Sequence, residues 1–209
     1  AKQAEINEKK SNASNAALVA IDAKTGEVLA MVGSKDYFGE PSPDGCKPGV
    51  NCRFDPNVNI ATSPRQPGSS FKPYVYLTAF EKGYTPETLL WDVDTEFDQG
   101  IGQSYNPKNY DNKNRGLLKM KDALAMSLNV PAVKTLYLAG VKNSVNTAKS
   151  MGITSLNYPD RYGLSLVLGG GEVKLIDHTA AFGTLATGGV RHNDTPILRI
   201  IDGRGETLE

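Results

Sequence analysis

The chain of 209 residues has no excess of charge of either sign, because 23 Lys and Arg residues balance 23 Asp and Glu residues. Nucleic-acid-binding domains normally carry a basic excess or a basic stripe, so this balance argues against nucleic acid as a partner. The sequence also has no apolar run close to the roughly 18 residues that a membrane-spanning helix needs. The remaining composition, 39% hydrophobic and 22% charged, is that of an ordinary globular chain.

Histidine and cysteine are both scarce, with two of each: His178, His192, Cys46 and Cys52. A zinc site needs three or four ligands at short spacings, and these four residues are too widely separated to suggest one. A histidine-dependent hydrolase would have to use one of the two histidines as its base. We therefore expect no metal or organic cofactor, and we expect catalysis to depend on Ser, Lys, Asp, Glu or Tyr.

The order of the expected elements is two strands, then mostly helices, then a further strand. Residues 1–15 are mainly polar and are interpreted as a linker, and residues 16–33 alternate around a glycine-containing turn, which predicts a β-hairpin. Residues 34–68 hold six of the twelve prolines and are predicted to form a long loop. The pattern indicates an α+β fold whose sheet is incomplete in this chain. Helices are expected at 69–82, 117–127, 131–139, 143–151 and 172–187, and strands at 88–97 and 196–202.

Ser69 and Lys72 stand three residues apart at the start of the helix expected at 69–82, so their side chains project from one face. A serine hydroxyl is a weak nucleophile unless a nearby base accepts its proton. A lysine amine can be that base if burial lowers its pKa. The alternative from these four residues alone is an N-cap serine followed by a solvated lysine.

A second motif, Ser127-Leu128-Asn129, lies where one expected helix ends and another begins. A second hydroxyl can relay protons, and an asparagine amide can both donate to and accept from a peptide. The same Ser-x-Asn pattern occurs at 144–146 and 155–157. We interpret Ser144 as a helix N-cap and place Ser155 in a loop, so only Ser127 is expected to point into a cleft.

Several segments of the chain together resemble the transpeptidase domain of class A, bifunctional penicillin-binding proteins. They are GSSFKP, SLNVPAV, IDAKTGEVLAMVGS, RQPG and LVLGGGEVKLIDHTAAFGTLATGG. The resemblance runs from about Ala16 to the end of the chain. It implies a serine penicillin-recognising fold, like that of β-lactamases and transpeptidases, and a D,D-transpeptidase that cross-links peptidoglycan stem peptides and is acylated by β-lactams. It makes Ser69 the nucleophile, Lys72 its general base, Ser127 a proton relay and Asn129 a ligand of the substrate amide.

The third motif of the family is not found at its expected place. In the family, a Lys-Thr-Gly or Lys-Ser-Gly triplet lies on a strand downstream of the second motif. Here the triplet is Lys24-Thr25-Gly26, upstream of Ser69, and we interpret it as a turn. We therefore take the chain to be the N-terminal part of the domain, residues 16–209, and expect the remaining strands in a C-terminal piece, either later in the protein or as a separate chain. The hairpin would then expose backbone and the side chains of Leu18, Val19 and Val28.

The resemblance also implies an extracytoplasmic location, periplasmic or at the cell surface, with a membrane anchor in the full-length protein and this piece soluble. In such an oxidising compartment Cys46 and Cys52 would form a disulfide, while the alternative is two free thiols. Gly169-Gly170-Gly171 matches no phosphate-binding pattern and is given no ligand. We expect His178 to be a packed residue and Trp91 to lie in the core.

Rival functions remain open from the sequence. The first is a D,D-carboxypeptidase, in which water is the acceptor, and the second is a β-lactamase of the same fold, for which no additional base is evident. A third, of another class, is a non-catalytic module that binds peptidoglycan. The presence of both Ser69 and Lys72 speaks against that module, which would need neither.

Overall fold

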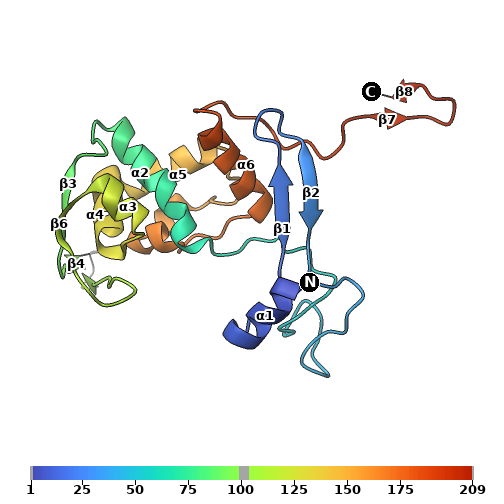
Figure 1. Cartoon of the computed structure of the whole chain (residues 1–209), viewed down its shortest axis with the longest axis horizontal. Helices are drawn as coiled ribbons and strands as arrows, with labels where there is room; N and C mark the ends of the chain where they lie inside the picture. The colour runs from blue at the N-terminus through green and yellow to red at the C-terminus, as the bar shows by residue number, and fades with distance from the viewer. Residues whose placement is uncertain (1, 99–103, 209) are drawn as a thin grey trace. The chain divides into compact units, whose positions relative to one another are not determined.

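The structure is a computed structural model that describes residues 2–98 and 104–208. It contains two compact units. One, called the hairpin unit below, comprises Ala1–Arg65 and Lys174–Glu209. The other, called the helical unit, comprises Gln66–Val173. Figure 1 shows the helices α2 to α5 gathered in the helical unit, whereas the strands β1 and β2 belong to the hairpin unit.

The helical unit begins with a short 3-10 helix, η1 (Gly68–Phe71), which continues directly into the α-helix α2 (Lys72–Glu81). The sequence predicted a single α-helix over 69–82. In the structure the first turn of this segment, which contains Ser69, is a 3-10 helix instead. Pro73 stands in the first turn of α2, where its missing N–H breaks no helical hydrogen bond. This helical segment turns one face into the core, where Phe71, Val75 and Ala79 are 0% exposed and Thr78 is 2% exposed.

A small sheet follows, in which β3 (Leu89–Asp92) pairs antiparallel with β6 (Gly116–Lys119). A second pair joins β4 (Phe97–Asp98) to β5 (Ser104–Tyr105). The helix expected over 117–127 was therefore too long: residues 116–119 are extended, and α3 runs only from Met120 to Ala125. Pairing with a strand distant in sequence overrides local propensity here.

The alternation along β3 also corrects the prediction for Trp91. Leu90 and Asp92 point to the buried side of the strand, whereas Leu89 and Trp91 point to the other, and Trp91 is 58% exposed. Successive side chains of a strand face opposite sides, so burial of Leu90 and Asp92 leaves Trp91 outside.

Two further helices complete the core of the helical unit, α4 (Asn129–Ala139) and α5 (Val141–Ser150). Helix α4 packs against α2, α5 and the 3-10 helix η3 (Leu164–Leu168); another 3-10 turn, η2, spans Pro159–Arg161. Ser144 lies inside α5 and donates to the carbonyl of Gly140 at 3.0 Å, so its interpretation as an N-cap was wrong. Gly140, with φ of 87°, separates α4 from α5 and places the start of α5 at Val141.

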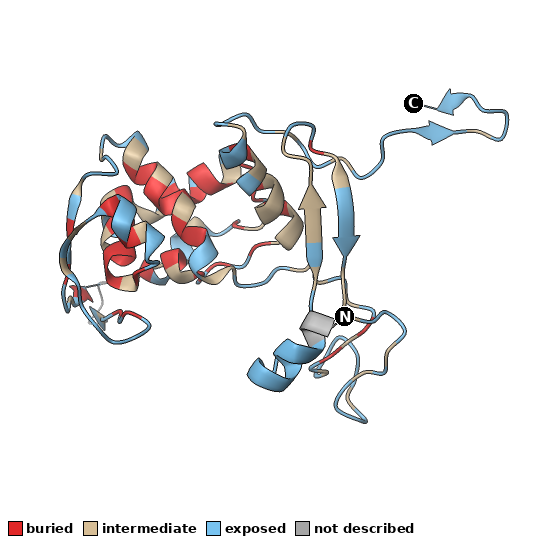
Figure 2. Ribbon diagram, viewed as in Figure 1, coloured by how far each residue is buried: buried red, intermediate tan, exposed pale blue. Residues whose placement is uncertain are grey.

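Buried residues concentrate on α2, α4 and α5, as the red segments of Figure 2 show. Among the described apolar residues with side chains that are buried, only Phe54, Pro56, Ala61 and Ala181 lie in the hairpin unit. The hydrophobic core that the structure describes is therefore almost wholly that of the helical unit.

The hairpin unit contains the helix α1 (Lys2–Ser11), whose residues 5–11 are exposed, and the predicted hairpin, β1 (Leu18–Ile21) with β2 (Val28–Val32). The strands are antiparallel, with Leu18 opposite Val32, and α6 (Leu175–Ala186) packs against β1. Leu18 is exposed as expected, but Val19 and Val28 are half-buried, and β2 exposes three further large apolar side chains. These are Leu29, Met31 and Val32.

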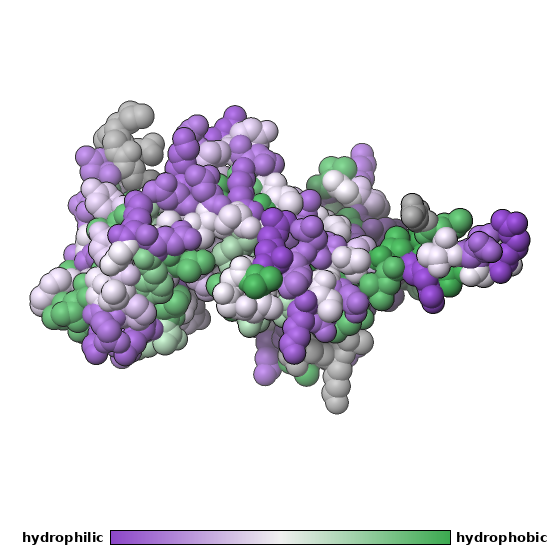
Figure 3. Space-filling model, turned by 90° about the horizontal axis from the view of Figure 1, so that it is seen from above, coloured by the Kyte–Doolittle hydropathy of each residue, from purple (hydrophilic) through white to green (hydrophobic). Residues whose placement is uncertain are grey.

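The chain after α6 is more irregular than predicted. Helix α6 begins at Leu175, three residues later than expected, and two glycines with positive φ, Gly188 and Gly189, follow its C-terminal end. The strand expected at 196–202 shortens to β7 (Ile200–Ile201), which pairs with β8 (Thr207–Leu208). Figure 3 shows hydrophobic residues on the surface at this end of the chain; they include Ile197, Leu198, Ile200 and Ile201.

Each sheet that the described residues form has two strands. Together with the helices, these short sheets make a mixed architecture, as the prediction of an α+β fold required. The long segment between β2 and η1 holds no helix or named strand among its residues, as predicted for 34–68.

Candidate active site

Ser69 lies in η1, the 3-10 turn that leads into α2, and it is exposed. In a 3-10 helix the side chains at i and i+3 eclipse each other, so this turn keeps Ser69 and Lys72 on one side. The backbone N–H of Lys72 donates to the Ser69 carbonyl, which ties the two residues together. In the part of the chain that the structure describes, no hydrogen bond joins the Ser69 hydroxyl to the Lys72 amine.

Lys72 is the first residue of α2 and is only 1% exposed. Its Nζ donates to the Ser127 carbonyl at 2.6 Å, to Ser127 Oγ at 3.2 Å and to Asn129 Oδ1 at 2.9 Å. Burial disfavours the charged ammonium and lowers the pKa of Lys72 from 10.5 to about 8. With a pKa near neutral pH, the amine can lose its proton, and the neutral form has a free lone pair that can accept one.

Ser127 stands at the corner between α3 and α4, as the sequence predicted, and its φ is +52°. Its N–H donates to the Leu124 carbonyl at 2.9 Å, and the next N–H, of Leu128, donates to the Ala123 carbonyl at 3.0 Å. This pair of hydrogen bonds is the Schellman ending of a helix, whose left-handed residue is usually glycine. A serine in this conformation is strained, and such strain is often found at functional sites.

Asn129 is the first residue of α4, and both ends of its side-chain amide are engaged. Its Oδ1 accepts from Lys72 Nζ, and its Nδ2 donates to the Lys108 carbonyl at 2.8 Å. The structure therefore brings three of the four predicted site residues, Lys72, Ser127 and Asn129, into direct contact, and it places Ser69 one turn before Lys72.

Sequence reasoning missed Asn109, which caps α4 from a distant loop. Its Oδ1 accepts the N–H of Asn129 at 2.8 Å and that of Val130 at 3.3 Å, and its Nδ2 donates to both carboxylate oxygens of Asp92 at 2.9 Å. Helix N-termini leave backbone N–H groups without partners, and a side-chain oxygen normally satisfies them from the residue just before the helix. Here the cap comes from about twenty residues upstream, so no local pattern indicates it.

The three glycines after η3 also matter for the site. A Cβ added to Gly169 would lie 2.2 Å from the backbone nitrogen of Gly68, the residue before Ser69. Only glycine permits so close an approach between two backbones. Gly169 therefore supports the turn that presents Ser69. Added Cβ atoms at Gly170 and Gly171 would meet Ser165 at 2.7 Å and Leu156 at 2.8 Å.

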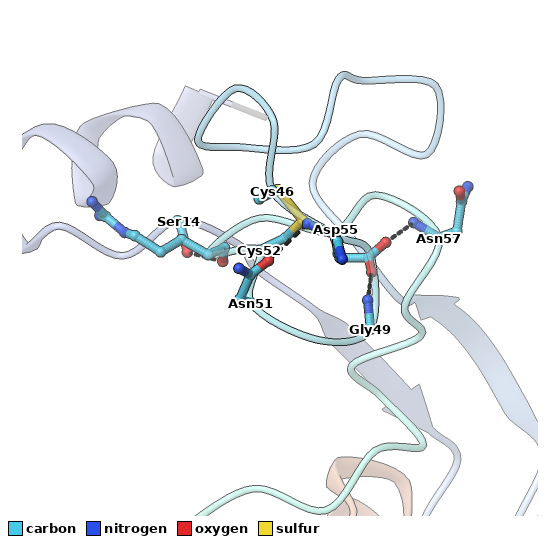
Figure 4. Close-up of a disulfide and its surroundings, with 9 residues drawn as sticks. Ser14, Cys46, Gly49, Asn51, Cys52, Asp55 and Asn57 are labelled. Carbon is cyan, nitrogen blue, oxygen red and sulfur yellow. Dashed lines mark hydrogen bonds between the residues drawn. A yellow bond between two sulfur atoms is a disulfide. The ribbon is translucent and has the colours of Figure 1, made fainter.

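Cys46 and Cys52 are joined by a disulfide in the loop of the hairpin unit, with the sulfur atoms 2.01 Å apart. Figure 4 shows the surrounding loop, in which Asp55 accepts the N–H of Gly49 at 2.8 Å and that of Asn57 at 3.2 Å. These contacts order a segment that has almost no apolar core of its own.

The remaining candidates have structural explanations. Lys24 and Thr25 are exposed in the turn between β1 and β2, and Gly26 has a φ of +81° there, as the interpretation as a turn predicted. His178 is half-buried in α6 against the ring of Phe182, and burial lowers its pKa. Among the described residues, no three His, Cys, Asp or Glu side chains lie close enough to share a metal ion.

Comparison with known proteins gives the family. The family described as "Penicillin binding protein transpeptidase domain" matches residues 16–184, so this chain belongs to the penicillin-binding protein transpeptidases. Among similar curated proteins, penicillin-binding protein 2D of Bacillus subtilis is 38% identical over 196 residues, and penicillin-binding protein 1A of Aquifex aeolicus is 34% identical over 194 residues. These matches cover 90% and 92% of this chain but only 25% and 24% of the two relatives.

Solved structures agree on the fold. Penicillin-binding protein 1A from Haemophilus influenzae superimposes with a TM-score of 0.77 and 26% identity, covering 93% of this chain and 27% of that chain. PonA1 from Mycobacterium tuberculosis, solved in complex with penicillin V, has a TM-score of 0.75 and 23% identity, covering all of this chain and 54% of that one. The penicillin-recognising serine fold predicted from the sequence is thereby confirmed. No helix in the described part of the chain has the length and apolar character needed to cross a bilayer.

Proposed function

We propose that this chain supplies the nucleophile and proton-transfer groups of a serine D,D-transpeptidase that forms peptidoglycan cross-links through an acyl-enzyme on Ser69. The observation that carries the proposal is the contact of one buried amine, Lys72 Nζ, with both members of the second motif, Ser127 and Asn129. A solvated lysine after an N-cap serine, which is the simpler reading of the first motif, would make no such contacts.

The proposed acylation begins with neutral Lys72. Its lone pair accepts the Ser69 hydroxyl proton as Oγ bonds to the carbonyl carbon between the two terminal D-alanines. The backbone N–H of Ser69, at the start of a helical segment, can donate to the oxyanion that forms. The carbon–nitrogen bond then breaks, and the Lys72 proton reaches the leaving amine of D-alanine through the Ser127 hydroxyl. These transfers leave an ester on Ser69 and a neutral lysine.

Deacylation reverses the same transfers with a different amine. The amino group of a neighbouring stem peptide attacks the ester and gives up a proton, which returns to Ser69 Oγ as the ester bond breaks. Asn129, whose amide can both donate and accept, would hold the backbone amide of the donor peptide. No metal or organic cofactor takes part in either half-reaction.

The partners that we propose are stem peptides of peptidoglycan and, as acylating inhibitors, β-lactams. We also propose that the natural protein is extracytoplasmic and membrane-anchored, and that strands carrying the family's third motif come from a C-terminal remainder of the same domain. The family assignment supports these proposals. The experiments below therefore use the natural protein that contains this chain.

The test is covalent labelling with a fluorescent penicillin, followed by mass spectrometry of the labelled peptide. We expect the label on Ser69 and its complete loss in Ser69→Ala. Ser70→Ala is the matched control, because it removes the adjacent hydroxyl, which donates to the Pro67 carbonyl at 2.6 Å, and it should still be labelled on Ser69. Labelling that persists in Ser69→Ala would overturn the proposal.

The same adduct distinguishes the rival activities. A penicilloyl ester that persists for many minutes supports the transpeptidase, whereas rapid release of the hydrolysed drug would indicate a β-lactamase. Release of D-alanine from a stem-peptide substrate to water, with no cross-linked product when an acceptor amine is present, would indicate a carboxypeptidase.

A further inference from the structure

The Asp92–Asn109 pair lies next to the proposed site without belonging to either of its motifs. Asp92 is at the end of β3 and is 0% exposed, and Asn109, in the loop between β5 and β6, is 4% exposed. Asn109 Nδ2 donates to both Asp92 carboxylate oxygens and to the Lys113 carbonyl, each at 2.9 Å. Asp92 Oδ2 also accepts the N–H of Arg115 at 2.8 Å.

This bonding fixes the orientation of the Asn109 amide. Its nitrogen is committed to three oxygen acceptors, so its oxygen must face the opposite way, toward the start of α4. There it accepts the N–H groups of Asn129 and Val130. An amide flipped end for end would place an NH₂ group against those two N–H donors and an oxygen against the carboxylate, and both contacts would be repulsive.

The consequence reaches the proposed base in two steps. Asn129 is held at its backbone by Asn109 Oδ1 and at its side chain by the Lys108 carbonyl, from the residue next to Asn109. The Asn129 Oδ1 that remains is directed to Lys72 Nζ at 2.9 Å. Residues 108–109 thus hold Asn129 by two hydrogen bonds, and the Asn129 Oδ1 accepts from Lys72.

We propose that Asn109, oriented by Asp92, is a positioning residue of the acylation reaction, which sets the place of Asn129 and through it the contacts of Lys72. This inference rests on the proposed function above. Asn109 touches neither substrate nor the reacting atoms in it; it acts through Asn129. Displacing a catalytic constellation by about 1 Å commonly costs about a hundredfold in rate.

The test exchanges donor and acceptor between the two positions. Asn109→Asp keeps an oxygen for the N–H groups of α4 but loses the donor to Asp92 and to the Lys113 carbonyl, and it faces Asp92 with a second carboxylate. We expect the second-order rate constant of labelling by fluorescent penicillin to fall about tenfold to a hundredfold. Adding Asp92→Asn restores a hydrogen bond of reversed polarity, and the double variant should recover to within several-fold of the wild type.

Asn114→Asp is the matched control, because Asn114 also donates to a neighbouring carboxylate, that of Asp94 at 3.3 Å, but in the described part of the chain it makes no hydrogen bond to α4. Its labelling rate should stay within twofold of the wild type. Rate constants, rather than final amounts of label, are compared, because unfolded molecules lower the amount without altering the rate constant of the folded ones.

The pH profile separates positioning from general stability. Asn129 Oδ1 accepts a hydrogen bond that favours charged Lys72, so its displacement in Asn109→Asp should move the pH midpoint of labelling, and the double variant, which has the net charge of the wild type, should return it. Unchanged rate constants and an unchanged midpoint in Asn109→Asp, or a double variant no faster than the single one, would overturn the inference. Absence of label on Ser69 in the wild type would instead overturn the proposed function, so the two failures are distinct.

Discussion

The two units of this chain differ in how they are stabilised. In the helical unit, α2 and α4 present fully buried faces, and residues such as Val75, Val133 and Leu136 are 0% exposed. In the hairpin unit, a loop without regular structure carries the Cys46–Cys52 disulfide, and β2 leaves Leu29 64% exposed. The proposed site residues all belong to the helical unit. Positioning proton-transfer groups requires side chains that are held in place by packing, and the helical unit provides such packing around the proposed site.

The sharpest test of the helical unit removes the buried amine at its centre. Lys72→Ala should slow labelling by fluorescent penicillin by about a hundredfold to ten-thousandfold, because general bases contribute rate factors of that size. The control Lys121→Ala removes an exposed amine paired with Glu87 and should leave the rate within twofold. A labelling rate in Lys72→Ala close to that of the wild type would assign the base to another residue.

The wild-type rate should also depend on pH in a defined direction. Burial lowers the pKa of Lys72 to about 8, and the proposed base is the neutral amine, so labelling should rise as the pH increases through that value. Between pH 7 and pH 9 the neutral fraction grows by roughly tenfold. A rate constant measured by stopped flow that is flat from pH 6 to pH 10 would contradict the assignment.

A matched pair of leucines tests the difference in packing between the units. Leu136→Ala, in α4 at 0% exposure, should lower the free energy of unfolding by about 2 to 5 kcal/mol. Leu29→Ala, in β2 at 64% exposure, should lower it by no more than about 0.5 kcal/mol. Denaturant unfolding of the 209-residue chain measures both, and equal losses would mean that β2 is covered in solution.

The disulfide should matter to the hairpin unit more than to the site. Replacing both cysteines, Cys46→Ser with Cys52→Ser, should cost about 2 kcal/mol of stability, as expected for a short closed loop. Penicillin labelling of the variant below its melting temperature should remain within about twofold of the wild-type rate.

The control is a reducing agent, which should lower the melting temperature of the wild type but not that of the variant. Free alkylation of both thiols in the exported wild type would show that no disulfide forms.

The smallest effect that we expect is a difference between two substitutions at Ser127. Both Ser127→Gly and Ser127→Ala remove the hydroxyl and should slow acylation alike. Glycine accepts a φ of +52° without strain, so Ser127→Gly should be more stable than Ser127→Ala by about 1 kcal/mol. Thermal unfolding of the two variants measures the difference, and an equal or reversed order would show that this corner is not strained.

The sequence by itself determined the parts of the molecule that depend on local spacing. Two residues three apart beside Gly68 define the Ser69–Lys72 face, and alternation around Gly26 defines the hairpin. The sequence also predicted helices near the positions of α4 and α5, and the family resemblance followed from phrases in their order. These features depend on neighbours in sequence, whose geometry a helix or a turn specifies directly.

Only the tertiary structure decided which distant groups meet. Lys72 contacts Ser127 across 55 residues, and Asn109 caps α4 from 20 residues upstream. Pairing with β3 extends residues 116–119 and leaves Trp91 in solvent. No local pattern encodes these outcomes, because each depends on burial and hydrogen-bond satisfaction among segments that folding brings together. The lowered pKa of Lys72 has the same origin, since only burial removes the water that would otherwise stabilise its charge.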